Sequence, residues 1–164
     1  MRKTLLYLLT VMLLIVSGCF KKENDCAPRN ITAPASEIQA VKDYLTTNNI
    51  SATRHSSGVF YQIISEGSGV SPVICSSIRV KFSGKLVNGT EFESSQDVVL
   101  NLKLMIESWR TCLPLIKTMG RIRFFVPPTL GYGAEGKKDK ATGTVLVPSW
   151  EPVIIYEVTL FEVS

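Results

Sequence analysis

The sequence predicts an α+β fold in which an antiparallel β-sheet wraps around one α-helix. Two observations support this prediction. Apolar and β-branched runs of strand length follow one another from Gly58 to the C-terminus. One stretch among them instead repeats apolar residues at helical spacing. Several strands with a single internal helix are typical of an antiparallel sheet packed on that helix.

The elements of this domain follow in chain order. The expected strands cover residues 59–65, 77–87, 98–102, 122–126 and 153–163. The second strand ends at Val87-Asn88-Gly89-Thr90, and an Asn-Gly pair favours a two-residue hairpin turn because both positions accept positive φ. The internal helix is expected at residues 104–118, where helical spacing relates Ile106, Trp109, Leu113 and Ile116.

A further helix is expected at residues 36–50, ahead of the domain at 51–164. Ser36 followed by Gln39 is a capping-box pattern, and Asn48-Asn49 end the helical pattern. Its apolar face is formed by Ile38, Val41, Tyr44 and Leu45. A single amphipathic helix of this length is unstable alone in water, so it must dock on the domain or on a partner.

The N-terminus is expected to be a targeting segment. Arg2 and Lys3 precede an apolar run that breaks at Ser17-Gly18-Cys19, which is typical of a secretory signal peptide at residues 1–18. The run is too short to span a hydrocarbon core of ~30 Å comfortably. Val16-Ser17-Gly18-Cys19 resembles the bacterial lipobox, which implies acylation of Cys19; an ordinary signal peptide is the alternative. Residues 19–35 would then be the lipidated cysteine and a flexible tether.

Charge and cysteine content narrow the function classes. Loss of residues 1–18 removes Arg2 and Lys3 and no acid, so the net charge falls from +4 to +2, too little to indicate nucleic-acid binding. Three cysteines remain in a compartment expected to be oxidising. Cys112 follows Trp109 in the helical pattern and is interpreted as a buried thiol. A disulfide between Cys26 and Cys75 is expected, although spacing alone does not determine it.

The chain lacks the side-chain sets of most catalytic sites. His55 is the only histidine, and we interpret it as a polar turn residue. The sequence shows no nucleophile–base pair, no phosphate-binding loop and no Cys/His spacing that suggests a metal. We therefore expect neither metal nor cofactor.

One motif stands out at residues 126–133, Val-Pro-Pro-Thr-Leu-Gly-Tyr-Gly, where two prolines end a strand and glycines flank Tyr132 at a sharp turn. Four more blocks accompany it in order: Val80-Lys81-Phe82-Ser83-Gly84, Gly89-Thr90-Glu91-Phe92-Glu93-Ser94-Ser95, Met105-Ile106-Glu107-Ser108-Trp109 and Ile155-Tyr156-Glu157-Val158-Thr159-Leu160. Together they closely resemble the FKBP family of peptidyl-prolyl isomerases. The resemblance implies a curved half-barrel whose pocket lies between the helix and the concave face.

The resemblance also implies the pocket residues. Trp109 would form the floor under a proline ring, and the Ile106 N–H and the Tyr132 hydroxyl would bind substrate carbonyls. Glu93 would belong to the polar network. The remaining lining residues would be Phe82, Phe92, Val98, Met105, Leu146, Val147 and Tyr156. By their spacing alone, the aromatic residues could simply fill a core.

Three positions depart from the family pattern. Phe82 stands where tyrosine is usual, which removes a pocket hydroxyl, and Glu93 stands where aspartate is usual. Val98 replaces a frequent aromatic wall. Two functions are therefore weighed: a prolyl isomerase and folding helper, and a non-catalytic peptide-binding or chaperone lipoprotein of the same fold.

These interpretations define the expected partners and location. The partners are proline-containing unfolded or extended polypeptides and, through acylated Cys19, a lipid bilayer. The resemblance adds macrolide immunosuppressants as ligands. We expect a monomer in the cell envelope, lipid-anchored to a membrane and facing the periplasm or held at the outer membrane.

Overall fold

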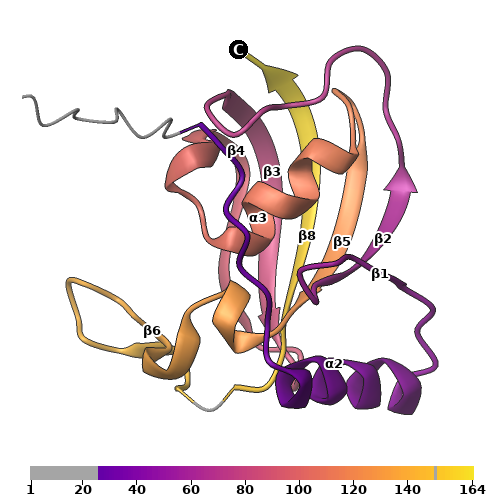
Figure 1. Cartoon of the computed structure of the whole chain (residues 1–164). Coiled ribbons are helices and arrows are strands. Elements are labelled where there is room, and N and C mark those ends of the chain that lie inside the picture. Colours follow the sequence, from indigo (N-terminus) through magenta and orange to yellow (C-terminus); the bar gives the residue numbers. More distant parts are fainter. Residues whose placement is uncertain (1–25, 150) are drawn as a thin grey trace, which may run out of the picture.

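The computed structural model describes residues 26–149 and 151–164, so the expected signal peptide and Cys19 lie outside the described residues. Six strands form one open, wholly antiparallel sheet in the order β1-β2-β5-β8-β3-β4. The sheet curves around helix α3, and helix α2 lies at one end of the molecule (Figure 1). This is the α+β arrangement that the sequence predicts.

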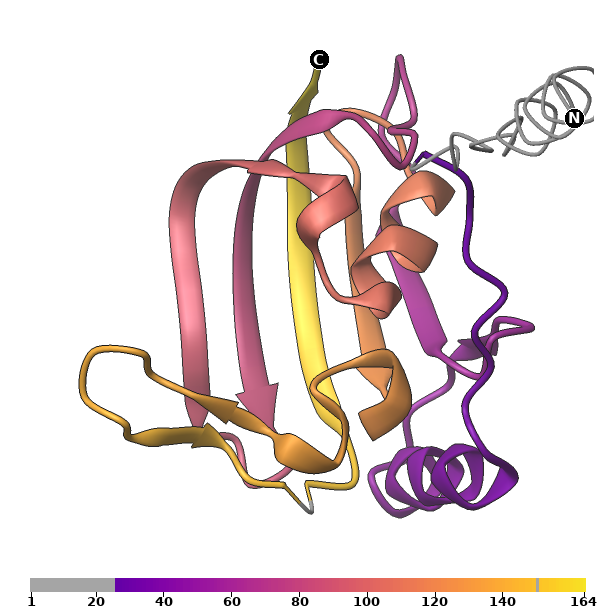
Figure 2. The same cartoon turned by 60° about the vertical axis from the view of Figure 1, so that its left-hand side comes forward.

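Four of the five predicted strands are present with ends within one residue of those expected, namely β2, β3, β5 and β8. The sheet consists of β1 (Thr53–Arg54), β2 (Phe60–Ser65), β3 (Ser77–Leu86), β4 (Glu91–Asn101), β5 (Arg121–Val126) and β8 (Ile154–Val163). A separate hairpin pairs β6 (Lys137–Lys138) with β7 (Val145–Val147). Figure 2 shows this hairpin, in orange, crossing near the ends of β3 and β4.

The bounds predicted for the third strand, residues 98–102, are wrong. Strand β4 begins at Glu91 and ends at Asn101. Its first half is polar and lies at the edge of the sheet, so it lacks the apolar alternation that identifies a strand. The short strands β1, β6 and β7 carry no such pattern either and were not predicted.

The internal helix is shorter than the predicted 104–118. Helix α3 spans Glu107–Cys112, between the 3-10 turns η1 (Leu102–Leu104) and η2 (Leu113–Leu115). Met105 and Ile106 are extended, and Pro114 lies within η2. Proline has no N–H for an α-helical bond and clashes with the preceding turn, which explains why the α-helix ends before it.

The core lies between α3 and the concave face of the sheet. Alternate residues of β8 are buried, namely Ile154, Tyr156, Val158 and Leu160. Trp109, Cys112 and Leu113 of the helical segment are fully buried against them. A sheet face and a helix face that are both apolar must cover each other, and this packing fixes where Trp109 lies.

Helix α2 (Ala35–Thr47) docks on the domain through Ile38, Val41 and Leu45, all of which are buried. The predicted capping box at Ser36 is wrong: the helix is preceded by Pro34 and has no side-chain cap, because Ser36 already lies inside it. Glu37 instead joins the helix to the turn η3 (Pro128–Leu130). Its carboxylate accepts hydrogen bonds from the Thr129 N–H and hydroxyl, both at 2.8 Å.

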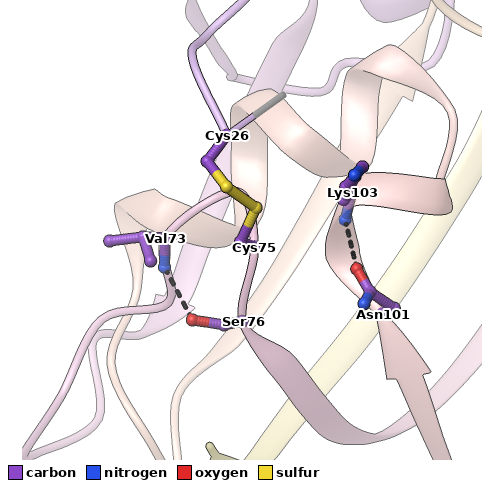
Figure 3. Close-up of a disulfide and its surroundings, with 6 residues drawn as sticks. All are labelled: Cys26, Val73, Cys75, Ser76, Asn101 and Lys103. Carbon is purple, nitrogen blue, oxygen red and sulfur yellow. Dashed lines mark hydrogen bonds between the residues drawn. A yellow bond between two sulfur atoms is a disulfide. The ribbon is translucent and has the colours of Figure 1, made fainter. Parts of the chain in front are cut away.

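A disulfide joins Cys26 to Cys75, the pair expected from the sequence, with Cα atoms 5.3 Å apart. It fastens residues 26–32, here called the strap, to the loop before β3 (Figure 3). Cys112 is a buried free thiol whose pKa is raised by burial. In the part of the chain that the structure describes, no helix is long and apolar enough to cross a membrane.

Candidate functional site

Aromatic side chains from five different elements, β3, β4, α3, β5 and β8, meet on the concave face of the sheet. The Trp109 ring lies edge-to-face against Phe82 (centroids 5.2 Å apart), Tyr156 (5.4 Å) and Phe124 (6.2 Å). The Phe92 ring approaches Tyr156 at 5.7 Å, also edge-to-face. Such geometry is favourable because the positive edge of one ring meets the negative face of the next. We call Phe82, Phe92, Trp109, Phe124, Tyr132 and Tyr156 the aromatic cluster.

A glycine in the middle strand makes room for this cluster. Gly84 of β3 is paired with Glu93 on one side and Tyr156 on the other. A Cβ atom at Gly84 would come within 2.8 Å of Phe92 and 2.9 Å of Tyr156. Both rings therefore lie directly over the backbone of β3, where any larger residue would displace them.

A β-bulge in β4 aims two consecutive side chains at the cluster. Gly84 pairs with Glu93 and Lys85 pairs with Glu91, so Phe92 is the extra residue between them. In a regular strand neighbouring side chains point to opposite faces, and a bulge breaks this alternation. Phe92 consequently packs on Tyr156 while the Glu93 carboxylate reaches the Tyr156 hydroxyl.

The Glu93 carboxylate is the centre of a hydrogen-bond network. The Tyr132 hydroxyl donates to Glu93 Oε1 at 3.0 Å, and the Tyr156 hydroxyl donates to the same oxygen. The two phenolic oxygens are 2.9 Å apart. Phe82 has no hydroxyl to offer this network, so its phenol donors are Tyr132 and Tyr156.

Lys137 of β6 is the cationic member of this network. Its ammonium donates to Glu93 Oε2 and, at 3.1 Å, to the Tyr132 hydroxyl. It also lies 5.0 Å from the Tyr132 ring centroid and 5.7 Å from that of Phe92, within cation–π range. The sequence did not indicate this role, because Lys137 belongs to a Lys-Lys-Asp-Lys run that is typical of a solvated loop.

The protonation states of the network are well defined. Burial raises the pKa of the Tyr156 phenol far above its ordinary value, and burial also raises the pKa of Tyr132. Burial alone would lower the pKa of Lys137, but hydrogen bonds to Glu93 and Tyr132 outweigh it and raise that pKa. At neutral pH both phenols are therefore neutral donors and Lys137 is a cation.

The structure gathers the residues expected at the pocket. Ring contacts and hydrogen bonds join six of them into one connected set: Phe82, Phe92, Glu93, Trp109, Tyr132 and Tyr156. The more peripheral residues pack against the same core: Val98, Met105, Ile106, Leu146 and the buried Val147. Phe124, which stacks on Tyr156 with centroids 5.6 Å apart, was not expected; it belongs to an apolar strand whose pattern does not distinguish it from its neighbours.

The cluster is closed in this conformation. Trp109 is fully buried and Tyr156 is only 1% exposed. Ile106, whose N–H the resemblance makes a substrate donor, immediately precedes α3, and its carbonyl accepts from the Trp109 N–H. The site therefore offers apolar ring faces, phenol donors and a backbone segment at a helix start. In the described part of the chain, no group of three or more His, Cys, Asp or Glu side chains could bind a metal ion.

Comparison with known proteins identifies related sequences and folds. The model of a family described as FKBP-type peptidyl-prolyl cis-trans isomerase matches residues 69–161. A probable FKBP-type peptidyl-prolyl cis-trans isomerase of Haemophilus influenzae is 34% identical over 133 residues, which is 79% of this chain and 49% of that protein. The FKBP-type peptidyl-prolyl cis-trans isomerase FkpA of Escherichia coli is 30% identical over 66% of this chain and 39% of its own length.

Solved structures show the same fold. The crystal structure of FkpA from Escherichia coli superposes with a TM-score of 0.63 at 27% identity, covering 79% of this chain and 60% of that one. A peptidyl-prolyl cis-trans isomerase from Pseudomonas syringae superposes with a TM-score of 0.66 over 80% of this chain and 97% of that chain, at 24% identity. The chain spans half or less of the length of the first curated relatives it matches, between 36% and 49%.

Proposed function

This chain belongs to the FKBP-type peptidyl-prolyl cis-trans isomerase family, and we propose that it accelerates rotation about X-Pro bonds in proline-containing polypeptides. The observation that carries the proposal is the aromatic cluster itself: Trp109 forms a floor, Phe92 and Tyr156 stand beside it, and the Tyr132 hydroxyl lies at its edge. The proposed isomerase domain is residues 51–164.

The chemistry requires no bond to be broken. Rotation about the amide faces a barrier of ~18–20 kcal/mol because the planar form has partial C–N double-bond character. A catalyst must bind the twisted amide more tightly than either planar form. An apolar ring-lined site disfavours the charge-separated planar form, which carries more charge on the carbonyl oxygen. The aromatic cluster would provide this apolar environment when the proline ring lies against Trp109.

We assign individual roles to the polar groups. The Tyr132 hydroxyl and the Ile106 N–H bind two substrate carbonyls and hold the chain on either side of the bond that rotates. In this conformation Tyr132 donates its single phenolic proton to Glu93. Peptide binding therefore has to turn that proton from Glu93 to the substrate carbonyl, while Glu93 keeps its hydrogen bonds from Tyr156 and Lys137. Val98, Met105, Leu146 and Val147 surround the residue before proline, which favours apolar side chains at that position.

A cis-to-trans assay on X-Pro tetrapeptides tests the function, with residues 20–164 as the enzyme. We expect a rate above the uncatalysed one that grows in proportion to enzyme concentration. A folded protein that leaves the rate unchanged at micromolar concentration would instead support the peptide-binding lipoprotein. A macrolide of the class that binds FKBP proteins should compete with the peptide, and gel filtration should show a monomer.

We also propose that the chain is a lipoprotein of the cell envelope, which places the isomerase beside folding envelope proteins. The support is the sequence Val16-Ser17-Gly18-Cys19 at the end of an apolar run. An N-terminal cysteine with three acyl chains would anchor stably, because one chain alone binds membranes only marginally. Detergent-phase partitioning tests the anchor. We expect the acylated wild type to enter the detergent phase and Cys19→Ser to stay in the aqueous phase. Equal partitioning would exclude the anchor.

A further inference from the structure

A cavity lies on the other side of α3 from the aromatic cluster. Its volume is about 580 Å³, within the range of small-molecule sites. Helix α3 contributes Glu107 and Arg110 to it, three residues apart, and the following turn η2 contributes Pro114. Trp109 and Leu113, which belong to the core, lie on the opposite face of the same segment. The two sites therefore share one helical segment and use different faces of it.

The strap lines one side of this cavity and is held at both of its ends. Cys26 is bonded to Cys75 at one end, and the Ala33 N–H donates to the Ser57 carbonyl at 2.9 Å just beyond the other. Figure 1 and Figure 2 both show this indigo segment running beside α3. Ile31 of the strap and Ile74 of the disulfide loop line the cavity and form apolar walls.

Arg110 is the unusual group in this cavity. Its side chain is only 2% exposed, yet its Nε–H finds no hydrogen-bond acceptor anywhere in residues 26–149 and 151–164. The closest anion is Glu107, whose Oε2 is 3.9 Å from Arg110 Nη1, too far for a hydrogen bond. A buried guanidinium whose Nε–H has no acceptor is unfavourable, since buried charged donors normally have a partner.

The charges around the cavity favour an anion as that partner. Arg29 on the strap also lines the cavity and is exposed, so it stands at the rim. Arg29 and Arg110 against Glu107 leave one net positive charge among the acidic, lysine and arginine side chains of the lining. A guanidinium fork matches a carboxylate in two parallel hydrogen bonds.

We propose that this cavity binds a small amphipathic monocarboxylate, with the carboxylate on Arg110 and the apolar body between Ile31 and Ile74. The ligand supplies the acceptors that the guanidinium lacks, and the residual positive charge neutralises its own. This site is independent of the isomerase pocket, because it uses none of the cluster residues.

The test is an NMR titration of the protein, disulfide intact and in detergent-free buffer, with 4-phenylbutyrate and with the isosteric neutral amide 4-phenylbutyramide. We expect the acid to bind at least about tenfold more tightly than the amide, as hydrogen bonds to a charged group do. Amide shifts should centre on Ile31, Ile74 and Arg110. Equal affinities, or shifts confined to Tyr132 and Lys137, would overturn the proposal.

Variants connect the binding to the cavity. Arg110→Met keeps most of the volume and should abolish the preference for the acid. Arg79→Gln removes the same charge from an exposed pair with Asp97 outside the cavity, so the preference should survive. Persistence of the preference in Arg110→Met would overturn the proposal.

A second variant decides the matter if Arg110→Met does not fold. Thr111 is half-buried and lines the cavity, so Thr111→Phe should fill it without disturbing the core. Circular dichroism checks the fold of each variant. We expect Thr111→Phe to lose binding of the acid, while isomerase activity remains; unchanged binding of the acid would mean that the ligand sits elsewhere.

Discussion

At the scale of single residues, the Glu93 carboxylate on β4 is bonded by groups from three other parts of the chain. The Tyr156 hydroxyl reaches it from β8, across the intervening strand β3, and the Tyr132 hydroxyl and the Lys137 ammonium are its other donors. Strand order and turn geometry bring these donors together, so their contacts with Glu93 could not be predicted from the sequence.

Removal of single hydroxyls should separate substrate binding from support of the pocket. Tyr132→Phe removes one neutral hydrogen bond worth ~0.5–1.5 kcal/mol, so kcat/KM should fall by roughly twofold to thirteenfold. Tyr156→Phe should chiefly lower the free energy of unfolding, because that hydroxyl is buried and faces Glu93. Peptide kinetics and urea unfolding of both variants distinguish these effects. A larger loss of rate in Tyr156→Phe than in Tyr132→Phe would contradict the assignment.

The same groups predict the response to pH. The folded-state pKa values of Tyr132, Tyr156 and Lys137 are raised. Their stabilising contribution is therefore complete below the unfolded values, which are ~10 for tyrosine and ~10.4 for lysine, and it is lost as the pH rises above them. We expect constant activity between pH 6 and 8 and a fall in stability above about pH 10. Thermal melting across this range measures it, and the fall should be smaller in Tyr156→Phe.

At the scale of elements, the β6–β7 hairpin is joined to the cluster through Lys137. Lys137 bonds Glu93 and Tyr132, and the Trp109 ring is fully buried. If the cluster is the proposed isomerase site, side chains around Trp109 must move before a proline ring can reach it. We expect the Lys137 contacts to be among those that peptide binding breaks.

Loosening the hairpin should make the pocket easier to enter. Lys137→Gln removes the ammonium from Glu93, so we expect a lower KM for the peptide and faster entry. Lys138→Gln is the matched control. Lys138 is the exposed neighbour of Lys137 in the same strand, so this variant removes the same charge outside the network. Steady-state peptide kinetics measure the effect. Equal kinetic constants for Lys137→Gln and the wild type would show that the lysine does not gate the pocket.

Elements also show how far sequence reasoning extends. The apolar periodicity of β3, β5 and β8 and of the segment around Trp109 was sufficient to predict the sheet and its helix. The first half of β4 was not predictable, because Glu91–Asp97 is a polar edge segment. The bulge at Phe92 follows from strand register, which is a long-range property. The role of Lys137 was not predictable for the same reason, because its anionic partner Glu93 is 44 residues away along the chain.

At the scale of the whole molecule, the disulfide ties the strap to the body of the domain. Cys26 and Cys75 are 49 residues apart, and the loop they close contains α2, β1 and β2. In the chain-entropy model such a bond destabilises the unfolded chain by roughly 4 kcal/mol. A double variant, Cys26→Ser with Cys75→Ser, should therefore unfold at a lower urea concentration. Reduced wild type should behave like the variant, whereas an unchanged midpoint would show that the bond adds no stability.

The central claim is that a closed aromatic pocket catalyses rotation about X-Pro bonds. Exchange NMR on a proline tetrapeptide at equilibrium tests it most directly, because the uncatalysed exchange takes tens to hundreds of seconds. With a catalytic amount of residues 20–164, we predict cis–trans exchange cross-peaks within a second. Binding of the peptide without such cross-peaks, in a protein shown to be folded, would contradict the claim and assign the chain to the non-catalytic binding class.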